Sequence, residues 1–147
     1  MNTIPHGIIE HPNSPRPTDH LFRVSIKCLI RDESGCVLVV KESGRDWWDL
    51  PGGGLDHGES VKTAIAREMR EEVGMTGDFT YRVVAVEDPL YSTRQNFYQI
   101  RLIVELFPET MTFSAGEDGD EVKYIDPATL QHSEELRERQ VYKYSQR

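Results

Sequence analysis

The segment 53–75, GGLDHGESVKTAIAREMREEVGM, constrains the fold of this chain most strongly. Apolar residues recur in it at four-residue steps, at Val61, Ile65, Met69 and Val73. This spacing places them in one stripe along a helix. Gly74 follows, where a glycine commonly ends a helix. The sequence therefore predicts a helix over residues 59–73 that packs its stripe against a core.

The same helix carries a cluster of acidic residues. Glu68, Glu71 and Glu72 fall within an arc of roughly 100°, at the edge of the apolar stripe. Like charges at this spacing repel one another, and partial burial raises the cost. A hard divalent cation such as Mg²⁺, which takes oxygen ligands, would offset that cost. The alternative interpretation is a solvated acidic helix face, partly offset by Arg67 and Arg70.

The rest of the chain predicts a mixed domain. Runs of β-branched and apolar residues predict strands at 22–30, 36–40, 81–86, 97–107 and 122–125. The first two are expected to form a hairpin around the turn at 31–35. Gly52, Gly53 and Gly54 predict a loop with unusual dihedrals or a close approach to another group. Asp126 and Pro127 predict the start of a polar C-terminal helix.

Composition and charge exclude several classes of protein. The 147 residues, 37% hydrophobic and 29% charged, fit one globular domain. A net charge of −8 without a dense basic run makes nucleic acid an unexpected partner. The chain has neither a signal peptide pattern nor the roughly 18 consecutive apolar residues of a membrane span, so we expect a cytoplasmic protein with no membrane partner. Residues 1–20, with four prolines, predict an irregular arm before a domain at 21–147.

The segment 53–75 resembles the Nudix box. That motif reads Gly, five residues, Glu, seven residues, Arg-Glu, an apolar residue, any residue, Glu-Glu, any residue, Gly, and an apolar residue. Every position is matched here, by Gly53, Glu59, Arg67, Glu68, Met69, Glu71, Glu72, Gly74 and Met75. The resemblance implies an α/β/α sandwich around a mixed β-sheet. Pattern alone supports an α/β or α+β domain with about five strands and two helices.

The resemblance also implies roles for the motif residues. Glu68, Glu71 and Glu72 match the family's metal-binding carboxylates, and Glu71 is the candidate for activating the attacking water. Arg67 matches the residue that orients nearby carboxylates, and its planar fork suits that role. Glu59 matches the loop glutamate that supports the metal site. The implied cofactor is Mg²⁺, with Mn²⁺ as a substitute.

Residues outside these positions complete the expected site. A later acidic loop supplies candidates for a further metal ligand, namely Glu117, Asp118, Asp120 and Glu121. Glu121 is the preferred one, and a solvated acidic loop is the alternative. Gly53, Trp47 and Trp48 are candidate substrate-binding residues, because an aromatic face can stack on a base. Core packing is the alternative role for at least one tryptophan.

Together these features imply a magnesium-dependent pyrophosphohydrolase. Water would attack one phosphorus of a diphosphate linkage in a small nucleotide-like substrate. The group beyond the diphosphate stays open, because a nucleoside triphosphate and a nucleotide sugar fit equally well. Two alternatives remain: a non-catalytic nucleotide-binding regulatory domain, and an RNA 5′-end pyrophosphohydrolase. The resemblance further suggests a homodimer.

Overall fold

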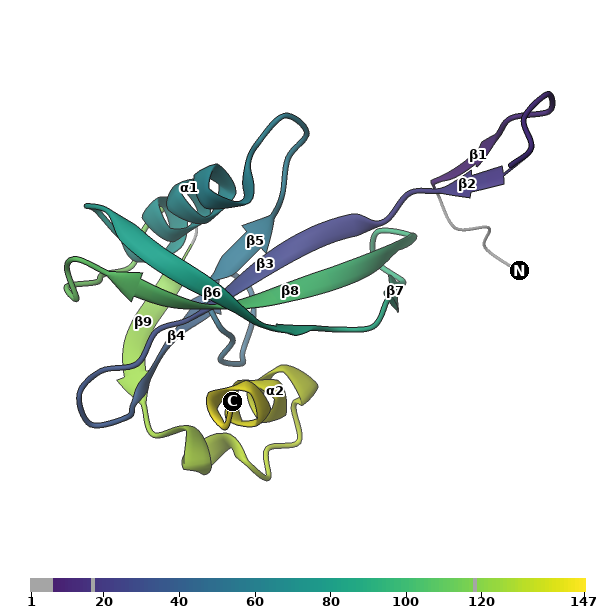
Figure 1. The fold of residues 1–147 in the computed structure, drawn as a ribbon. Helices are drawn as coiled ribbons and strands as arrows, with labels where there is room; N and C mark the ends of the chain where they lie inside the picture. The colour runs from purple at the N-terminus through teal and green to yellow at the C-terminus, as the bar shows by residue number, and fades with distance from the viewer. Residues whose placement is uncertain (1–6, 17, 118) are drawn as a thin grey trace.

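The chain folds into three layers (Figure 1). The structure is a computed structural model that describes residues 7–16, 18–117 and 119–147. A central layer of strands lies between α1 (Val61–Val73) on one side and α2 (Leu136–Ser145) on the other. The predicted mixed α+β class is therefore confirmed. None of the helices in these ranges is long and apolar enough to cross a membrane.

The main sheet is mixed. Its strands are β3 (Arg23–Leu29), β5 (Gly52–Gly54), β6 (Phe79–Val86), β7 (Leu90–Ser92) and β8 (Phe97–Pro108). Their order is β5-β3-β8-β6, and β7 also pairs with β8. The pair β3–β8 is parallel, and the other pairs are antiparallel. A separate antiparallel pair is formed by β4 (Val37–Glu42) and β9 (Gly119–Ile125).

The predicted hairpin of the first two strands is wrong. β3 and β4 meet at their turn, where Arg31 and Val37 form an isolated bridge and Leu38 N–H donates to the Ile30 carbonyl at 2.9 Å. Beyond the turn the strands diverge into different sheets, because both edges of β3 are occupied by β5 and β8.

Four strands of three residues each were not predicted. They are β1 (Ile8–Glu10), β2 (Thr18–His20), β5 and β7. β1 and β2 pair antiparallel, so the expectation of an irregular arm is wrong for these residues. Residues 1–6 and 17 of the arm lie outside the described residues. The three glycines form a strand paired with β3 rather than a loop. Such strands are too short for a period-two pattern to register.

The helix α1 forms as its sequence predicts. The Ser60 side chain accepts a hydrogen bond from Thr63 N–H at its start, and Gly74 ends it at φ 66°. Its apolar stripe, including Ile65 and Met69, packs on residues of β3 such as Ile26. The C-terminal helix is interrupted: a 3₁₀ turn, η1 (Pro127–Leu130), precedes α2.

Alternation along β3 builds two different faces. Ile26 and Cys28 pack in the core under α1. Leu29 packs in a second core with α2 residues. Successive side chains of a strand point to opposite faces, so Ser25 and Lys27 lie on the α2 face with Leu29. The α2 side of the sheet thus changes from apolar to polar along one strand.

Candidate active site

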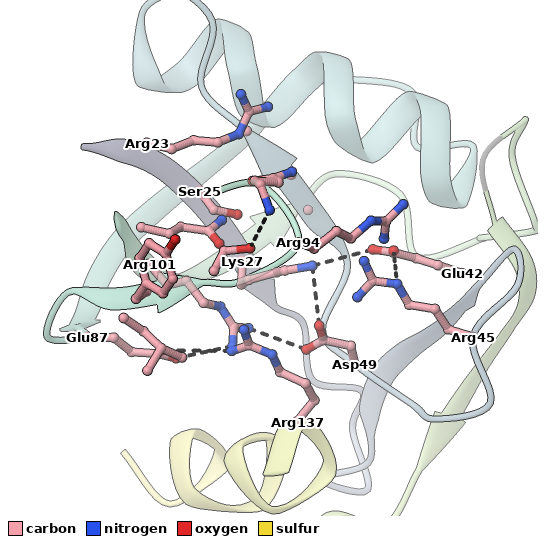
Figure 2. A pocket seen from close by; sticks show the side chains of 18 of the residues that line it. Arg23, Ser25, Lys27, Glu42, Arg45, Asp49, Glu87, Arg94, Arg101 and Arg137 are labelled. Atoms are coloured by element: carbon pink, nitrogen blue, oxygen red, sulfur yellow. Dashed lines mark hydrogen bonds and ion pairs between the residues drawn. The ribbon is translucent and has the colours of Figure 1, made fainter. Parts of the chain in front are cut away.

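An open cavity of about 380 Å³ lies on the polar part of this face (Figure 2). β3 contributes Ser25 and Lys27 to its lining, and β8 contributes Arg101. The segment 42–49, the glycines of β5, the loop around β7 and Arg137 of α2 also line it. The cavity therefore opens between the main sheet, the segment before β8 and the C-terminal helix.

A network of charged side chains lies at the base of the cavity (Figure 2). Lys27 Nζ is 3.4 Å from Asp49 Oδ2 and 3.7 Å from Glu42 Oε1. Arg101 is 3.4 Å from Asp49 Oδ1 and 3.3 Å from Glu87 Oε1. Burial alone would lower the pKa of Lys27, but nearby carboxylates, Asp49 first, outweigh it and raise this pKa. The buried ammonium therefore stays charged.

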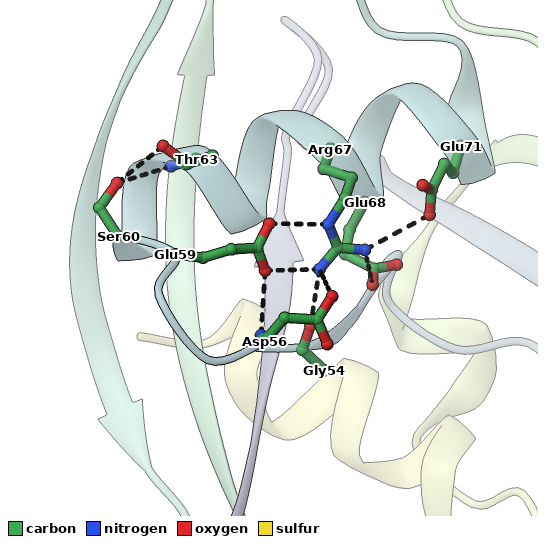
Figure 3. A network of polar contacts seen from close by, with 8 residues as sticks. All are labelled: Gly54, Asp56, Glu59, Ser60, Thr63, Arg67, Glu68 and Glu71. Carbon is green, nitrogen blue, oxygen red and sulfur yellow. Dashed lines mark hydrogen bonds and ion pairs between the residues drawn. The ribbon is translucent and has the colours of Figure 1, made fainter.

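A second network joins the motif residues on α1 (Figure 3). Arg67 Nε and Nη2 donate to the two Glu59 oxygens, both at 2.8 Å. Arg67 Nη1 donates to Glu68 Oε1 at 2.8 Å and to Glu71 Oε2 at 3.5 Å. Arg67 Nη2 also donates to the Gly54 carbonyl at 3.0 Å. The hydrogen bonds from Arg67 lower the pKa of Glu59 to about 2.

Two carboxyl groups of this helix are withdrawn from solvent. Glu72 is 4% exposed, and its Oε2 accepts a hydrogen bond from Gly52 N–H at 2.8 Å. Burial raises the pKa of Glu72 to about 8. Burial also raises the pKa of Glu68, against the opposing effect of Arg67. A nearby cation would offset the cost of ionising both groups.

The glycine strand β5 connects the cavity with these carboxylates. Gly52 and Gly53 both line the cavity. A Cβ at Gly53 would lie 2.4 Å from Glu68 Oε2. A Cβ at Gly52 would lie 2.0 Å from the Ile26 carbonyl oxygen, and Gly52 has φ +141°. Backbone without side chains is thus all that separates the cavity from the Glu68 and Glu72 carboxylates. The predicted close approach of the glycines is confirmed.

The acidic residues of α1 fit magnesium by donor type. Across the described ranges, no group of three or more His, Cys, Asp or Glu is gathered as a metal site. Arg67 holds the Glu68 carboxylate, and Gly52 N–H holds that of Glu72. Glu68, Glu71 and Glu72 nevertheless supply the carboxylate oxygens that Mg²⁺ prefers from one helix. Rotation of these side chains is required to bring the oxygens together.

The two tryptophans lie outside the cavity lining. Neither is among the lining residues in the described part of the chain. Trp48 packs against the α2-side core, with Lys41 Nζ at 4.7 Å and Lys123 Nζ at 4.4 Å from its ring centroid. The Arg45 guanidinium lies 5.5 Å from the Trp47 ring. These contacts favour the packing role for Trp48, and the cavity's aromatic wall is Tyr91 instead.

Glu121 lies away from the acidic face of α1. Val122 and Tyr124 of β9 pack against the α1-side core, whereas Ile125 packs against the other core. By strand alternation, Glu121 shares the face of Ile125, and it pairs in register with Lys41. The structure thus does not bring this residue to the motif carboxylates. Asp118 lies outside the described residues.

Sequence reasoning missed the charged base of the cavity. Lys27, Glu42, Asp49 and Arg101 are brought together from three separated segments. The sequence holds a signal for it, because Arg23, Ser25 and Lys27 alternate with apolar residues along the predicted strand 22–30. In a strand that is covered on both faces, such alternation indicates a polar cavity on one of the two faces.

A model of the NUDIX domain matches residues 21–145. The chain belongs to the Nudix hydrolase family. This Nudix chain is 30% identical over 105 residues to a Bacillus subtilis (strain 168) protein named "Putative 8-oxo-dGTP diphosphatase", covering 69% of this chain and 65% of that protein. It is 40% identical over 55 residues to the RNA pyrophosphohydrolase of Actinobacillus pleuropneumoniae serotype 5b (strain L20), covering 37% of this chain and 27% of that protein.

The fold is likewise that of known Nudix structures. The MutT protein from Methanosarcina mazei Go1 matches with a TM-score of 0.65 and 24% identity, over 85% of this chain and 93% of that one. At this level of sequence identity, the similarity shows a shared fold. The alignments with the RNA pyrophosphohydrolases span 27% to 32% of the length of those proteins.

Proposed function

We propose that this Nudix chain is a magnesium-dependent pyrophosphohydrolase that cleaves a diphosphate linkage in a small nucleotide-like substrate. A nucleoside triphosphate and a nucleotide sugar are the candidate substrates. One observation carries the proposal: the Glu68 carboxylate, which Arg67 holds, lies against Gly53, and Gly53 also lines the cavity. A substrate in the cavity would therefore have its phosphates beside Glu68 and Glu72.

Each motif residue has a role in this proposal. Magnesium held by Glu68, Glu71 and Glu72 would neutralise the diphosphate and polarise its P–O bonds. Arg67 keeps Glu59 and Glu68 in fixed positions through charged hydrogen bonds. Glu71 has the least buried side chain of the three helix carboxylates, 32% exposed, which supports its role in accepting a proton from the attacking water.

The test is product release across a substrate panel. The panel contains nucleoside triphosphates, nucleotide sugars, ADP-ribose and dinucleoside polyphosphates, each with and without magnesium. We expect magnesium-dependent cleavage of one class, with each product carrying a phosphate. Cleavage of no member, together with measurable nucleotide binding, would contradict the proposal in favour of a non-catalytic nucleotide-binding domain.

Two variants test the assigned carboxylates. Glu71→Gln and Glu72→Gln keep side-chain size and remove one negative charge each. We expect each to abolish most turnover while the circular dichroism spectrum stays unchanged. Glu134→Gln is the matched control, because Glu134 is exposed and precedes α2, away from the cavity lining. Near-normal activity of both Glu71→Gln and Glu72→Gln would remove the metal-carboxylate assignment.

A second candidate function is RNA 5′-end pyrophosphohydrolysis. The matched segment of the RNA pyrophosphohydrolases favours it, although the net charge of −8 does not. Comparing cleavage of free nucleoside triphosphates with that of 5′-triphosphorylated RNA separates the two functions. Faster cleavage of the RNA would favour this candidate. The homodimer implied by the family resemblance stays a prediction, which sedimentation of the free chain checks.

A further inference from the structure

The cavity beside the glycine strand carries an excess of positive charge. Its lining includes six basic side chains, Arg23, Lys27, Arg45, Arg94, Arg101 and Arg137, against three acidic ones, Glu42, Asp49 and Glu87. The whole chain has a net charge of −8. Positive charge is therefore concentrated at this place on an otherwise acidic protein. Such a cleft focuses its field on anionic ligands.

Internal ion pairs account for only part of this charge. The buried Lys27 and Arg101 pair with the three carboxylates. Arg45 also lies 3.1 Å from Glu42, and Arg137 lies 4.0 Å from Glu87. Within the described part of the chain, Arg23 and Arg94 have no carboxylate at ion-pairing distance. Both are exposed, and they come from β3 and from the loop between β7 and β8. Two guanidinium groups are thus available to a ligand from separate elements.

The base of the cavity also has unused hydrogen-bonding capacity. Arg101 is 4% exposed and lines the cavity. Its Nε is buried and has no hydrogen-bond acceptor among the described residues. A buried donor without an acceptor is costly. An anionic ligand in the cavity can supply acceptor oxygens to this region.

The position of the cavity relates it to the proposed reaction. Gly53 forms its wall and touches the Glu68 carboxylate, and the Arg23 guanidinium lies over Gly54. A substrate whose diphosphate lies at the acidic face of α1 therefore extends its remaining part toward Arg23. Charged and polar groups dominate the surface available to that part, because the apolar side chains of the lining are confined to Leu90 and Tyr91.

We infer that this cavity binds a phosphomonoester that the substrate carries in addition to its scissile diphosphate. The inference rests on the proposed function, and it narrows the substrate class to nucleotides with such an extra phosphate. Arg23 and Arg94 are the specificity-determining residues. Their planar guanidinium groups donate paired, charge-assisted hydrogen bonds to phosphate oxygens. A neutral sugar or base cannot form bonds of this strength.

The test uses matched probes that differ by one phosphate. NADP is compared with NAD, and coenzyme A with dephospho-coenzyme A. Binding is measured by calorimetry with EDTA and without magnesium, so that turnover plays no part. We expect the phosphorylated member of at least one pair to bind roughly tenfold more tightly, as one charged hydrogen-bonding contact provides.

Variants assign the preference to the named arginines. The double variant Arg23→Gln/Arg94→Gln is expected to reduce the preference to less than about threefold. Its melting temperature should stay unchanged, because both side chains are exposed and make no ion pair in the described structure. Arg139→Gln is the matched control, since Arg139 is an exposed arginine of α2 outside the cavity lining. It should keep the full preference.

The outcomes separate this inference from the proposed function. Equal binding within both pairs, binding of no probe, or a preference that survives in the double variant would overturn the inference. Magnesium-dependent cleavage of a nucleotide, without tighter binding of the phosphorylated probes, would support the proposed function and overturn the inference. A preference lost in the double variant, without cleavage of any substrate, would support the inference and count against the enzyme.

Discussion

Arg67 holds Glu59 at two points, with Nε bonded to Oε2 and Nη2 bonded to Oε1, each at 2.8 Å. The two residues lie at opposite sides of the turn into α1, so this pair fixes the loop against the helix (Figure 3). The same guanidinium contacts Glu68 and the Gly54 carbonyl. One side chain therefore sets the relative positions of the loop, the glycine strand and a proposed metal ligand.

Replacement of Arg67 by lysine tests this positioning role. Lysine keeps the charge but offers no planar fork, so Glu59 and Glu68 cannot both be held. We expect kcat/KM to fall roughly 10- to 100-fold, as for other groups that orient metal ligands. Arg70→Lys is the control, because Arg70 is exposed on the same helix. Equal activity of both variants in a steady-state assay would contradict the role.

Alanine substitutions at two glycines of β5 should differ in their effects on stability and on activity. In Gly53→Ala the new Cβ meets the end of the flexible Glu68 side chain, which can move aside. Activity should therefore fall while the melting temperature changes little. In Gly52→Ala the new Cβ meets the Ile26 backbone, which cannot move, so the fold itself should be lost. Melting curves and turnover of both variants check this, and a stable, fully active Gly52→Ala protein would refute it.

The helix and its acidic face could be predicted because their determinants are local. The apolar stripe, the Ser60 cap and Gly74 all act within α1 or at its ends. The spacing of the carboxylates along the helix places them on one face. The Nudix resemblance predicted that Arg67 orients nearby carboxylates and that Glu59 supports the metal site, but it did not pair the two residues. The structure joins them directly.

Other parts of the site depend on long-range pairing. β5 is a strand because β3 offers it an edge, not because Gly52–Gly54 favour extended structure. The cavity base joins Lys27, Asp49 and Arg101 through the parallel pairing of β3 with β8. The sequence does not reveal which residues of two parallel strands lie side by side. The charged base of the cavity therefore could not be predicted from the sequence.

The buried carboxyl of Glu72 predicts how stability depends on pH. Its pKa is raised by burial from its ordinary value near 4.5 to about 8 in the metal-free protein. Between these values the unfolded chain has lost the proton and the folded chain retains it. Folding therefore takes up a proton, and stability falls as pH rises through this window. Denaturant unfolding in EDTA across the window measures the slope.

Glu72→Gln isolates this effect. Glutamine stays neutral and can still accept the Gly52 N–H bond. We expect the variant to lose the fall in stability and to melt several degrees above the wild type at pH 8, where about 1 kcal/mol corresponds to roughly 4 °C. Magnesium should raise the melting temperature of the wild type more than that of the variant. An unchanged pH slope in Glu72→Gln would show that the slope has another source.

Removal of residues 1–20 tests the proposed boundary of the domain. β1 and β2 pair with each other, and Ile8 and Ile9 are exposed, so the described part of this hairpin adds little to either core. A two-stranded hairpin contributes little stability by itself. A chain that begins at Leu21 should therefore melt within about 4 °C of the full chain, on the scale of roughly 1 kcal/mol. It should also keep its turnover, because the cavity lining begins at Arg23. Loss of cooperative melting in this shortened chain would place the hairpin within the folded unit.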